Sequence, residues 1–236
     1  MSCSIILKTA GIGALVLLCH ASMAQLTGSI VKKHLLFSDK FKKGLNQTHW
    51  WVETLPDTSN RVYTLSGKLW LDTRDGVTVW YSKPLQGNYC ITYTRGFAAD
   101  SGANNRLSDL NNFWQASDPR NVNLFTRKGV LASYDSLLLY YAGIGGNYNS
   151  TTRFRKYDGN GNRVLLQEFT DSPHLLHANK PYHITILVKG ATTQLWVNKQ
   201  VWFSYTDAQP LPAGYFGLRS TKSRQWVDDV EIWEVD

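Results

Sequence analysis

The chain has 236 residues, enough for one large hydrophobic core, and 18% of them are charged, with a formal net charge of +7. A basic protein can meet nucleic acid, an anionic membrane surface or an acidic polysaccharide. The sequence has no extended block of Lys or Arg, no helix-turn-helix pattern and no RNP-like aromatic motif. We therefore expect no nucleic-acid partner.

Residues 1–24 have the pattern of a secretory signal peptide. Lys8 is followed by an apolar or small run over 10–19 and by a small-residue cleavage site that ends at Ala24. The run is too short for a membrane span, which needs about 20 residues. We expect a secreted or periplasmic protein without a membrane span, consisting of a single domain over 25–236. Export favours an acidic glycan as the partner.

The rest of the chain is a series of short β-type runs, rich in Val, Ile, Thr and aromatic residues and separated by Gly, Asn, Asp and Pro. The predicted strands are 35–41, 50–54, 61–65, 68–72, 77–83, 89–97, 110–116, 137–142, 151–157, 164–170, 182–189, 193–197, 201–205, 215–220 and 226–235. Helix should be marginal, with one turn near 123–129. About fifteen strands predict an all-β protein of two packed antiparallel sheets.

The segment 104–123 carries more polar chemistry than a strand needs to fold. Its prominent side chains are Arg106, Asp109, Asn111, Asn112, Trp114, Asp118 and Arg120. An aromatic platform, amides for hydroxyl groups, and carboxylates or guanidiniums are what a protein that handles sugars requires. We interpret the segment as half of a glycan site. The alternative is a strand followed by a polar loop whose Asn and Asp residues satisfy turns.

Strand alternation suggests which side chains share a face. It places Asn112 with Trp114 and Arg153 with Arg155, and it separates Arg219 from its apolar neighbours. We predict that these five residues face a concave glycan-binding surface. The residues expected in the core between the sheets are Phe154, Phe216 and Leu218. The full set of predicted substrate-binding residues is Arg106, Asn111, Asn112, Trp114, Arg120, Asn147, Arg153, Arg155 and Arg219.

Both ends of the chain carry familiar strand motifs. FSDKF at 37–41 and WVDDVEIWEV at 226–235 resemble the paired terminal strands of concanavalin A-like jelly rolls. Three interior motifs, NNRLSDLNNFWQASDPRN, GGNYNSTTRFRKY and GYFGLRSTKS, resemble secreted bacterial domains of unassigned function that neighbour jelly-roll glycosidases and polysaccharide lyases. The resemblance implies a concanavalin A-like jelly-roll sandwich over the whole mature chain. It implies no mechanism.

Arginines in the motif-rich segments suggest an acidic substrate. Arg153 and Arg155 repel each other on one strand face unless an anion or acid lies between them, and a guanidinium is suited to bidentate recognition of a carboxylate. We therefore expect a polysaccharide lyase that cleaves a uronate-containing glycan by β-elimination. The base that removes the C5 proton would be Tyr140 or Tyr141, since alternation turns one of them to the groove, and His174, His177 and His183 are weaker candidates.

Two other functions remain open. A glycoside hydrolase would need two carboxyl groups flanking the scissile bond, for which Asp109, Asp118 and Asp135 are available. The third function is a non-catalytic carbohydrate-binding module, although a single exported domain favours an enzyme. We expect no required cofactor, and a structural Ca²⁺ near Asp39, held with Asp228 and Asp229, is the metal site to test.

Overall fold

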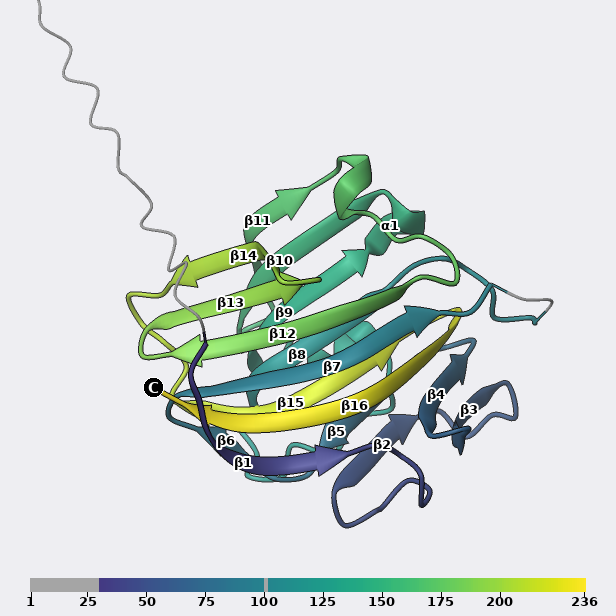
Figure 1. Cartoon of the computed structure of the whole chain (residues 1–236), viewed down its shortest axis with the longest axis horizontal. Helices are drawn as coiled ribbons and strands as arrows, with labels where there is room; N and C mark the ends of the chain where they lie inside the picture. Colours follow the sequence, from purple (N-terminus) through teal and green to yellow (C-terminus); the bar gives the residue numbers. More distant parts are fainter. Residues whose placement is uncertain (1–29, 100–101) are drawn as a thin grey trace, which may run out of the picture.

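The computed structural model describes residues 30–99 and 102–236, so the predicted signal peptide lies outside the described residues. Two antiparallel sheets of eight strands each form a sandwich. Figure 1 shows them as two layers, with β12, β7 and β16 side by side in one layer and β10, β9 and β8 in the other. This arrangement confirms the predicted all-β sandwich.

Sheet A has the order β14-β13-β12-β7-β16-β4-β3, with β1 also paired to β16. Its strands are β1 (Lys32–Asp39), β3 (Asn60–Leu65), β4 (Lys68–Thr73), β7 (Tyr89–Phe97), β12 (Pro181–Lys189), β13 (Thr192–Val197), β14 (Gln200–Thr206) and β16 (Ser223–Val235). The pairing of β1 with β16 aligns Phe37 with Ile232 and Asp39 with Val230. The two terminal motifs of the sequence therefore lie side by side, as their resemblance implies.

Sheet B has the order β11-β10-β9-β8-β15-β5-β2, with the short β6 paired to β15. Its strands are β2 (Trp50–Thr54), β5 (Val77–Tyr81), β6 (Leu85–Gln86), β8 (Leu110–Ser117), β9 (Leu138–Gly145), β10 (Thr151–Asp158), β11 (Arg163–Phe169) and β15 (Ala213–Ser220). All of the pairings in this sheet are antiparallel.

The main core fills the space between the sheets. Phe154, Phe216 and Leu218 are fully buried there against residues of sheet A, as predicted. Complete burial of one such side chain contributes about 1.5–3 kcal/mol relative to leaving it exposed. Among the described residues no helix is long and apolar enough to cross a membrane.

Helix is marginal, but its predicted position is wrong. The segment 123–129 is a loop, and the helical pieces are η1 (Leu131–Tyr134), α1 (Gly146–Asn149) and η2 (Ser172–His174). Asn121 and Asn123 accept hydrogen bonds through their side chains from backbone N–H groups two residues later, both at 3.0 Å. Such local bonds offer the backbone an alternative to helix.

The outer face of sheet B carries a second apolar cluster beneath the loop 118–137. Trp80 and Phe113 from the sheet pack with Tyr134 and Leu137 of the loop, and all four are fully buried. Part of the outer face is therefore covered by the chain itself. The candidate site lies beside this cluster, at the edge of the loop.

Candidate functional site

A row of register partners crosses seven strands of sheet B on its outer face. From β2 to β11 the row reads Glu53, Thr78, Arg219, Asn111, Gly143, Arg153 and Glu168. Partner residues on neighbouring strands project from the same face and can interact. Charged or amide side chains at five of the seven positions are unusual for a row that is largely buried, so this row is where a site is to be sought.

The neighbouring row on the same face is mostly aromatic. It reads Trp51, Trp80, Gly217, Phe113, Tyr141, Arg155 and Leu165. Loop 118–137 covers the Trp80 and Phe113 part of it. Tyr141 and Arg155 continue the row past the loop and lie next to the polar row.

Glu53, at one end of the polar row, holds the covering loop. It is 2% exposed, and its carboxylate accepts hydrogen bonds from Trp80 Nε1 at 2.8 Å, Tyr134 Oη at 2.8 Å and the Arg127 backbone N–H at 2.6 Å. Burial raises the pKa of Glu53, and the three hydrogen bonds oppose that rise without cancelling it. This carboxylate has a structural role.

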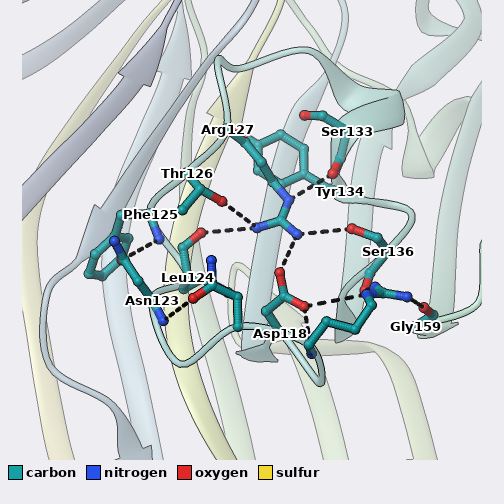
Figure 2. Close-up of polar contacts among 12 residues, drawn as sticks. Asp118, Asn123, Leu124, Phe125, Thr126, Arg127, Ser133, Tyr134, Ser136 and Gly159 are labelled. Atoms are coloured by element: carbon teal, nitrogen blue, oxygen red, sulfur yellow. Dashed lines mark hydrogen bonds and ion pairs between the residues drawn. The ribbon is translucent and has the colours of Figure 1, made fainter.

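Arg127, in the middle of the loop, links its first residue, Asp118, to Ser133 and Ser136 near its last. Figure 2 shows its guanidinium between Asp118 and Ser136 on one side and Leu124 and Thr126 on the other. The Nη2 atom donates to Asp118 Oδ2 at 2.7 Å, and Nε donates to the Ser133 carbonyl oxygen at 2.7 Å. Burial raises the pKa of Asp118, but hydrogen bonds from Arg127 and from the Arg120 backbone outweigh it and leave the pKa below its usual range.

Asp118 and Arg120 therefore anchor the loop. Arg120 Nη1 donates to the Gly159 carbonyl oxygen at 2.8 Å, and its Nη2 donates to the Ser136 carbonyl oxygen. Asp109 and Asp118 precede and follow β8, so they stand more than about 20 Å apart at 3.3 Å per strand residue. This distance is too long for the two carboxylates to flank one glycosidic bond. Asp135 forms an ion pair with Arg163, with Nε 2.6 Å from Oδ1.

Arg219 is the central residue of the polar row, and it lies at the edge of loop 118–137. It is 2% exposed, and its Nη2 donates to the Gly129 carbonyl oxygen at 3.2 Å. Nε and Nη1 are buried and have no hydrogen-bond partner among residues 30–99 and 102–236. Burial lowers the pKa of Arg219, while Tyr141, Tyr134 and Asp109 act in the opposite direction. A buried guanidinium with two unpaired donors costs stability unless a ligand or an ordered water pairs with it.

Asn111 is the register partner of Arg219 and also has a buried donor that lacks a hydrogen-bond partner among the described residues. Its Oδ1 accepts a hydrogen bond from Tyr141 Oη at 2.9 Å, whereas its buried Nδ2 has no partner in the described part of the chain. The next position in the row is Gly143, and a methyl group there would lie 2.8 Å from Asn111 Oδ1 and 2.6 Å from Tyr141 Cζ. The missing side chain at Gly143 lets the Tyr141 hydroxyl reach Asn111. Burial raises the pKa of Tyr141 well above its usual range, so the phenol stays protonated.

A second buried arginine supports the site from inside the sandwich. Arg95 projects from β7 and donates to the carbonyl oxygens of Asn111 and Arg219, both at 2.7 Å. Its Nε and Nη2 donate to Gln225 Oε1 of β16. Burial lowers the pKa of Arg95 to about 10, so it remains charged at neutral pH. Arg95 thus fixes the two site residues relative to each other and adds positive charge behind them.

The rim of the site is formed by Arg106, Asp109 and Tyr148. Arg106 and Asp109 form an ion pair, and the Arg106 guanidinium lies 5.1 Å from the centre of the Tyr148 ring. Tyr148 is 78% exposed and sits between Asn147 and Asn149, and the three residues have φ values of 51°, 58° and 62°. This left-handed conformation costs roughly 1–2 kcal/mol per residue, least for Asn. A strained turn that presents an exposed aromatic ring is typical of a binding site.

Arg153 and Arg155 share the outer face of sheet B, but the ligand argument from their repulsion fails. Arg153 forms an ion pair with Glu168, its register partner on β11, so the required acid belongs to the chain itself. Arg155 lies 5.8 Å from the centre of the Tyr141 ring. Arg155 therefore remains close to the site, while Arg153 lies at its edge.

The predicted orientation of Asn112 and Trp114 is wrong, since both are buried between the sheets. Trp114 Nε1 donates to Thr193 Oγ1 of sheet A at 2.8 Å, and Asn112 Nδ2 donates to the Ala142 carbonyl oxygen at 3.1 Å. Both faces of β8 are buried, because loop 118–137 covers the outer one. Alternation therefore separates the two faces of β8 but cannot tell which one meets the other sheet.

Tyr140 also points into the core, so the prediction of a groove-facing tyrosine falls to Tyr141. The Tyr140 hydroxyl donates to Asp207 Oδ2 at 2.5 Å, and Lys156 Nζ lies 2.6 Å from the same oxygen. Asn147 is exposed in the strained turn, at the rim. Of the predicted site residues, the structure brings together Asn111, Tyr141 and Arg219, with Arg106, Asp109, Asn147 and Arg155 around them.

The proposed calcium site gains no support. The described residues contain no group of three or more His, Cys, Asp or Glu side chains that could hold a metal ion. Asp39 instead accepts hydrogen bonds from the Phe41 backbone at 2.7 Å and from Trp50 Nε1 at 2.9 Å, and Asp229 forms an ion pair with Lys40.

Comparison with known proteins shows which family and which solved structures this chain resembles. The model of the family described as "Domain of unknown function (DUF6250)" matches residues 71–230. A Bacillus subtilis protein of unknown function with a galectin-like fold is similar at 14% identity, with a TM-score of 0.70 over 88% of this chain and 99% of that one. The endo-beta-1,3-glucanase of Pyrococcus furiosus has 10% identity and a TM-score of 0.62, covering 88% and 98%.

Carbohydrate binding module CBM66 from Bacillus subtilis has 10% identity and a TM-score of 0.55, covering 79% of this chain and 96% of that one. No curated protein matches the sequence. These similarities confirm the concanavalin A-like jelly-roll fold that the terminal motifs imply. At such identities they establish the fold alone.

Proposed function

The chain belongs to the DUF6250 family, and from its site we propose that it is an exported carbohydrate-active protein that binds a uronate-containing polysaccharide and cleaves it by β-elimination. The observation that carries the proposal is the group of unpaired donors on the outer face of sheet B. Arg219 offers Nε and Nη1, and Asn111 offers Nδ2. A carboxylate has two oxygens that accept from a guanidinium and an amide together.

The uronate carboxylate would occupy these donors. Bound there, it becomes able to accept the negative charge that grows on it when the neighbouring C5 proton leaves. Arg219 and Asn111 stabilise that charge, and Arg95 adds a second positive charge from behind the sheet. Both the Arg219 and Asn111 side chains are buried, so each of these interactions is stronger than it would be in water.

Two groups beside the donors can move the protons. Asp109, at the rim, takes the proton from C5. The electron pair forms the C4–C5 double bond and breaks the bond from C4 to the glycosidic oxygen. Tyr141, whose phenol stays protonated, donates its proton to that oxygen. Water then restores the proton to Tyr141 and removes the one on Asp109. Tyr148 would stack on a neighbouring sugar ring.

Binding without cleavage is the second candidate. The burial of Arg219 and Asn111 favours it, because a polymer reaches these donors only if the Gly129 carbonyl or the rim moves. A site of this kind could hold a uronate at a chain end and release it unchanged.

An activity assay separates the two candidates. The protein is incubated with uronate and neutral glycans while ultraviolet absorbance of the unsaturated product and new reducing ends are followed. Elimination predicts both signals on a uronate glycan and neither on neutral glycans. Tyr141→Phe should abolish the signals and retain binding. The matched control is Tyr89→Phe, which removes a buried hydroxyl on sheet A that has no partner among the described residues, and this variant should remain active.

Two outcomes of this assay would contradict elimination. Reducing ends without absorbance would replace elimination by hydrolysis. Binding with neither signal would leave a carbohydrate-binding module.

A further inference from the structure

The outer face of sheet A carries an aromatic row at its β3 edge. Tyr63 of β3, Trp70 of β4 and Trp226 of β16 are register partners on three adjacent strands. Their chain neighbours Leu69, Leu71 and Val227 point the other way, into the core. The row is therefore on the side of the molecule opposite to the Arg219 site. We name these three residues the aromatic row.

The rings of the aromatic row form a half-exposed surface. Those of Tyr63 and Trp70 are nearly parallel, at 7°, with centres 6.2 Å apart. The Trp226 ring lies over Gly96 of β7, where a methyl group would be 2.6 Å from Cζ2. Gly96 thus seats Trp226 flat on the sheet. Each of the three rings is only partly buried.

A cation lies over each ring. Lys68 Nζ is 3.7 Å from the centre of the Trp226 ring, the Arg224 guanidinium is 4.8 Å from Trp70, and that of Arg61 is 5.7 Å from Tyr63. Such contacts are weak at exposed sites, so a ligand with negative groups can displace the cations.

A polar row borders the aromatic one on the same three strands. Arg61, Asp72 and Arg224 are register partners, and Asp72 is buried with its Oδ2 2.6 Å from Arg61 Nη2. Asn104 Nδ2 donates to the other Asp72 oxygen at 2.8 Å. These side chains and Ser59 line a pocket of about 290 Å³. The aromatic row therefore leads into a pocket with hydrogen-bonding side chains.

We propose that the aromatic row, with the pocket beside it, is a second binding surface for an extended acidic polysaccharide. Neighbouring strands are about 4.8 Å apart, so the rings offer consecutive flat faces on which the C–H faces of sugar rings can stack. Lys68, Arg61 and Arg224 outnumber the carboxylates of Asp72 and of Asp228, which follows Trp226 on the same face of β16. This charge excess favours a polymer with carboxylate or sulfate groups. The aromatic row with its three cations is better suited to an acidic polysaccharide than to an apolar protein partner.

The inference does not depend on the proposed function, because the two surfaces lie on different sheets and share none of these residues. A polymer held on sheet A would remain close to the molecule while another stretch reaches the site on sheet B. The gain would appear as tighter retention of long chains, through effective concentration.

Affinity electrophoresis in gels that contain polygalacturonate, alginate or a neutral glucan tests the inference. The Tyr63→Ala/Trp70→Ala protein should lose retention by the acidic polymers at least fivefold, and Lys68→Glu, a surface change, should weaken it in the same direction. Trp196→Ala is the matched control, since Trp196 is half-exposed on the same face of sheet A but on β13. Thermal unfolding of each variant verifies the fold.

Failure of this inference is distinguishable from failure of the proposed function. Unchanged retention of both aromatic-row variants, or no retention of the wild-type protein by either acidic polymer, would overturn the second surface. Absence of cleavage with retention lost only in the aromatic-row variants would support it and count against elimination. Cleavage of a short uronate oligosaccharide should be the same in the wild-type and Lys68→Glu proteins.

Discussion

Arg95 donates a 2.7 Å hydrogen bond to the backbone carbonyl oxygen of Arg219, so the core-facing arginine directly positions the strand that carries the outward-facing one. The same guanidinium donates to the Asn111 carbonyl oxygen, also at 2.7 Å. The separation of Arg219 and Asn111 is therefore set from inside the sandwich. A site that depends on two adjacent strands gains a rigid support from this contact.

Replacement of Arg95 by Leu should lower the free energy of unfolding by about 3 kcal/mol or more. The change leaves two buried carbonyl oxygens and Gln225 without their donor, and each buried unpaired group costs about 1–3 kcal/mol. Urea denaturation measures the effect. Lys189→Ala, at an exposed strand end, is the control and should stay within about 0.5 kcal/mol of the wild type. A loss of similar size in both variants would contradict the role of Arg95.

Glu53 should make stability depend on pH. Its pKa in the folded chain is raised above the ordinary value of 4.5, so the folded chain binds the proton more tightly than the unfolded one. Its contribution to unfolding free energy is therefore present below pH 4.5 and is lost as pH rises through the folded pKa. The difference in unfolding free energy, wild type minus Glu53→Gln, should decrease over that interval in urea titrations at successive pH values. A difference that increases with pH would show that the pKa is lowered.

Much of the fold was predictable, because alternation and turn residues mark the strands locally. Phe154, Phe216 and Leu218 could be placed in the core, since alternation puts them on the face opposite the arginines of their strands, Arg153, Arg155 and Arg219. The inward orientation of Arg95 could also have been predicted. On β7 it shares a face with Ile91 and Tyr93, whose side chains are buried. An arginine on a buried face signals a structural or functional anchor.

The orientation of β8 could not be predicted, because the sequence does not reveal that loop 118–137 folds over sheet B. Trp114 is buried between the two sheets, and Phe113 is buried between sheet B and the loop. Tyr148 was missed although it stands between Asn147 and Asn149, residues that tolerate the left-handed region. The register that aligns Arg219 with Asn111 is a long-range property, set by the pairing of β15 with β8.

Gly143→Ala should impair the site far more than it impairs the fold. The added methyl group would lie within 2.8 Å of Tyr141 and Asn111 and would push the phenol away from the amide. We expect cleavage or binding of uronate glycans to fall at least tenfold. Gly146→Ala is the matched control, since its methyl group would meet Thr151 Oγ1 at 3.3 Å and nothing closer. Equal activity of the two variants would count against the Tyr141–Asn111 arrangement.

Tyr148→Asn should separate stability from binding. Asn adopts a φ of 58° at lower cost than Tyr, so the melting temperature should be unchanged or slightly higher. Loss of the exposed ring should weaken glycan binding severalfold, measured by calorimetry. A lower melting temperature with unchanged affinity would show that the ring serves the fold.

The central claim is that the unpaired donors of Arg219 bind a carboxylate. Calorimetric titration of wild-type and Arg219→Met proteins with a uronate oligosaccharide and its neutral, reduced counterpart tests it most directly. Methionine removes the unpaired buried donors, so unfolding free energy should be unchanged or higher. We predict that Arg219→Met loses at least tenfold in affinity for the uronate and little for the neutral sugar. Equal affinity of the wild-type protein for the two sugars, or an equal loss on both, would contradict the claim.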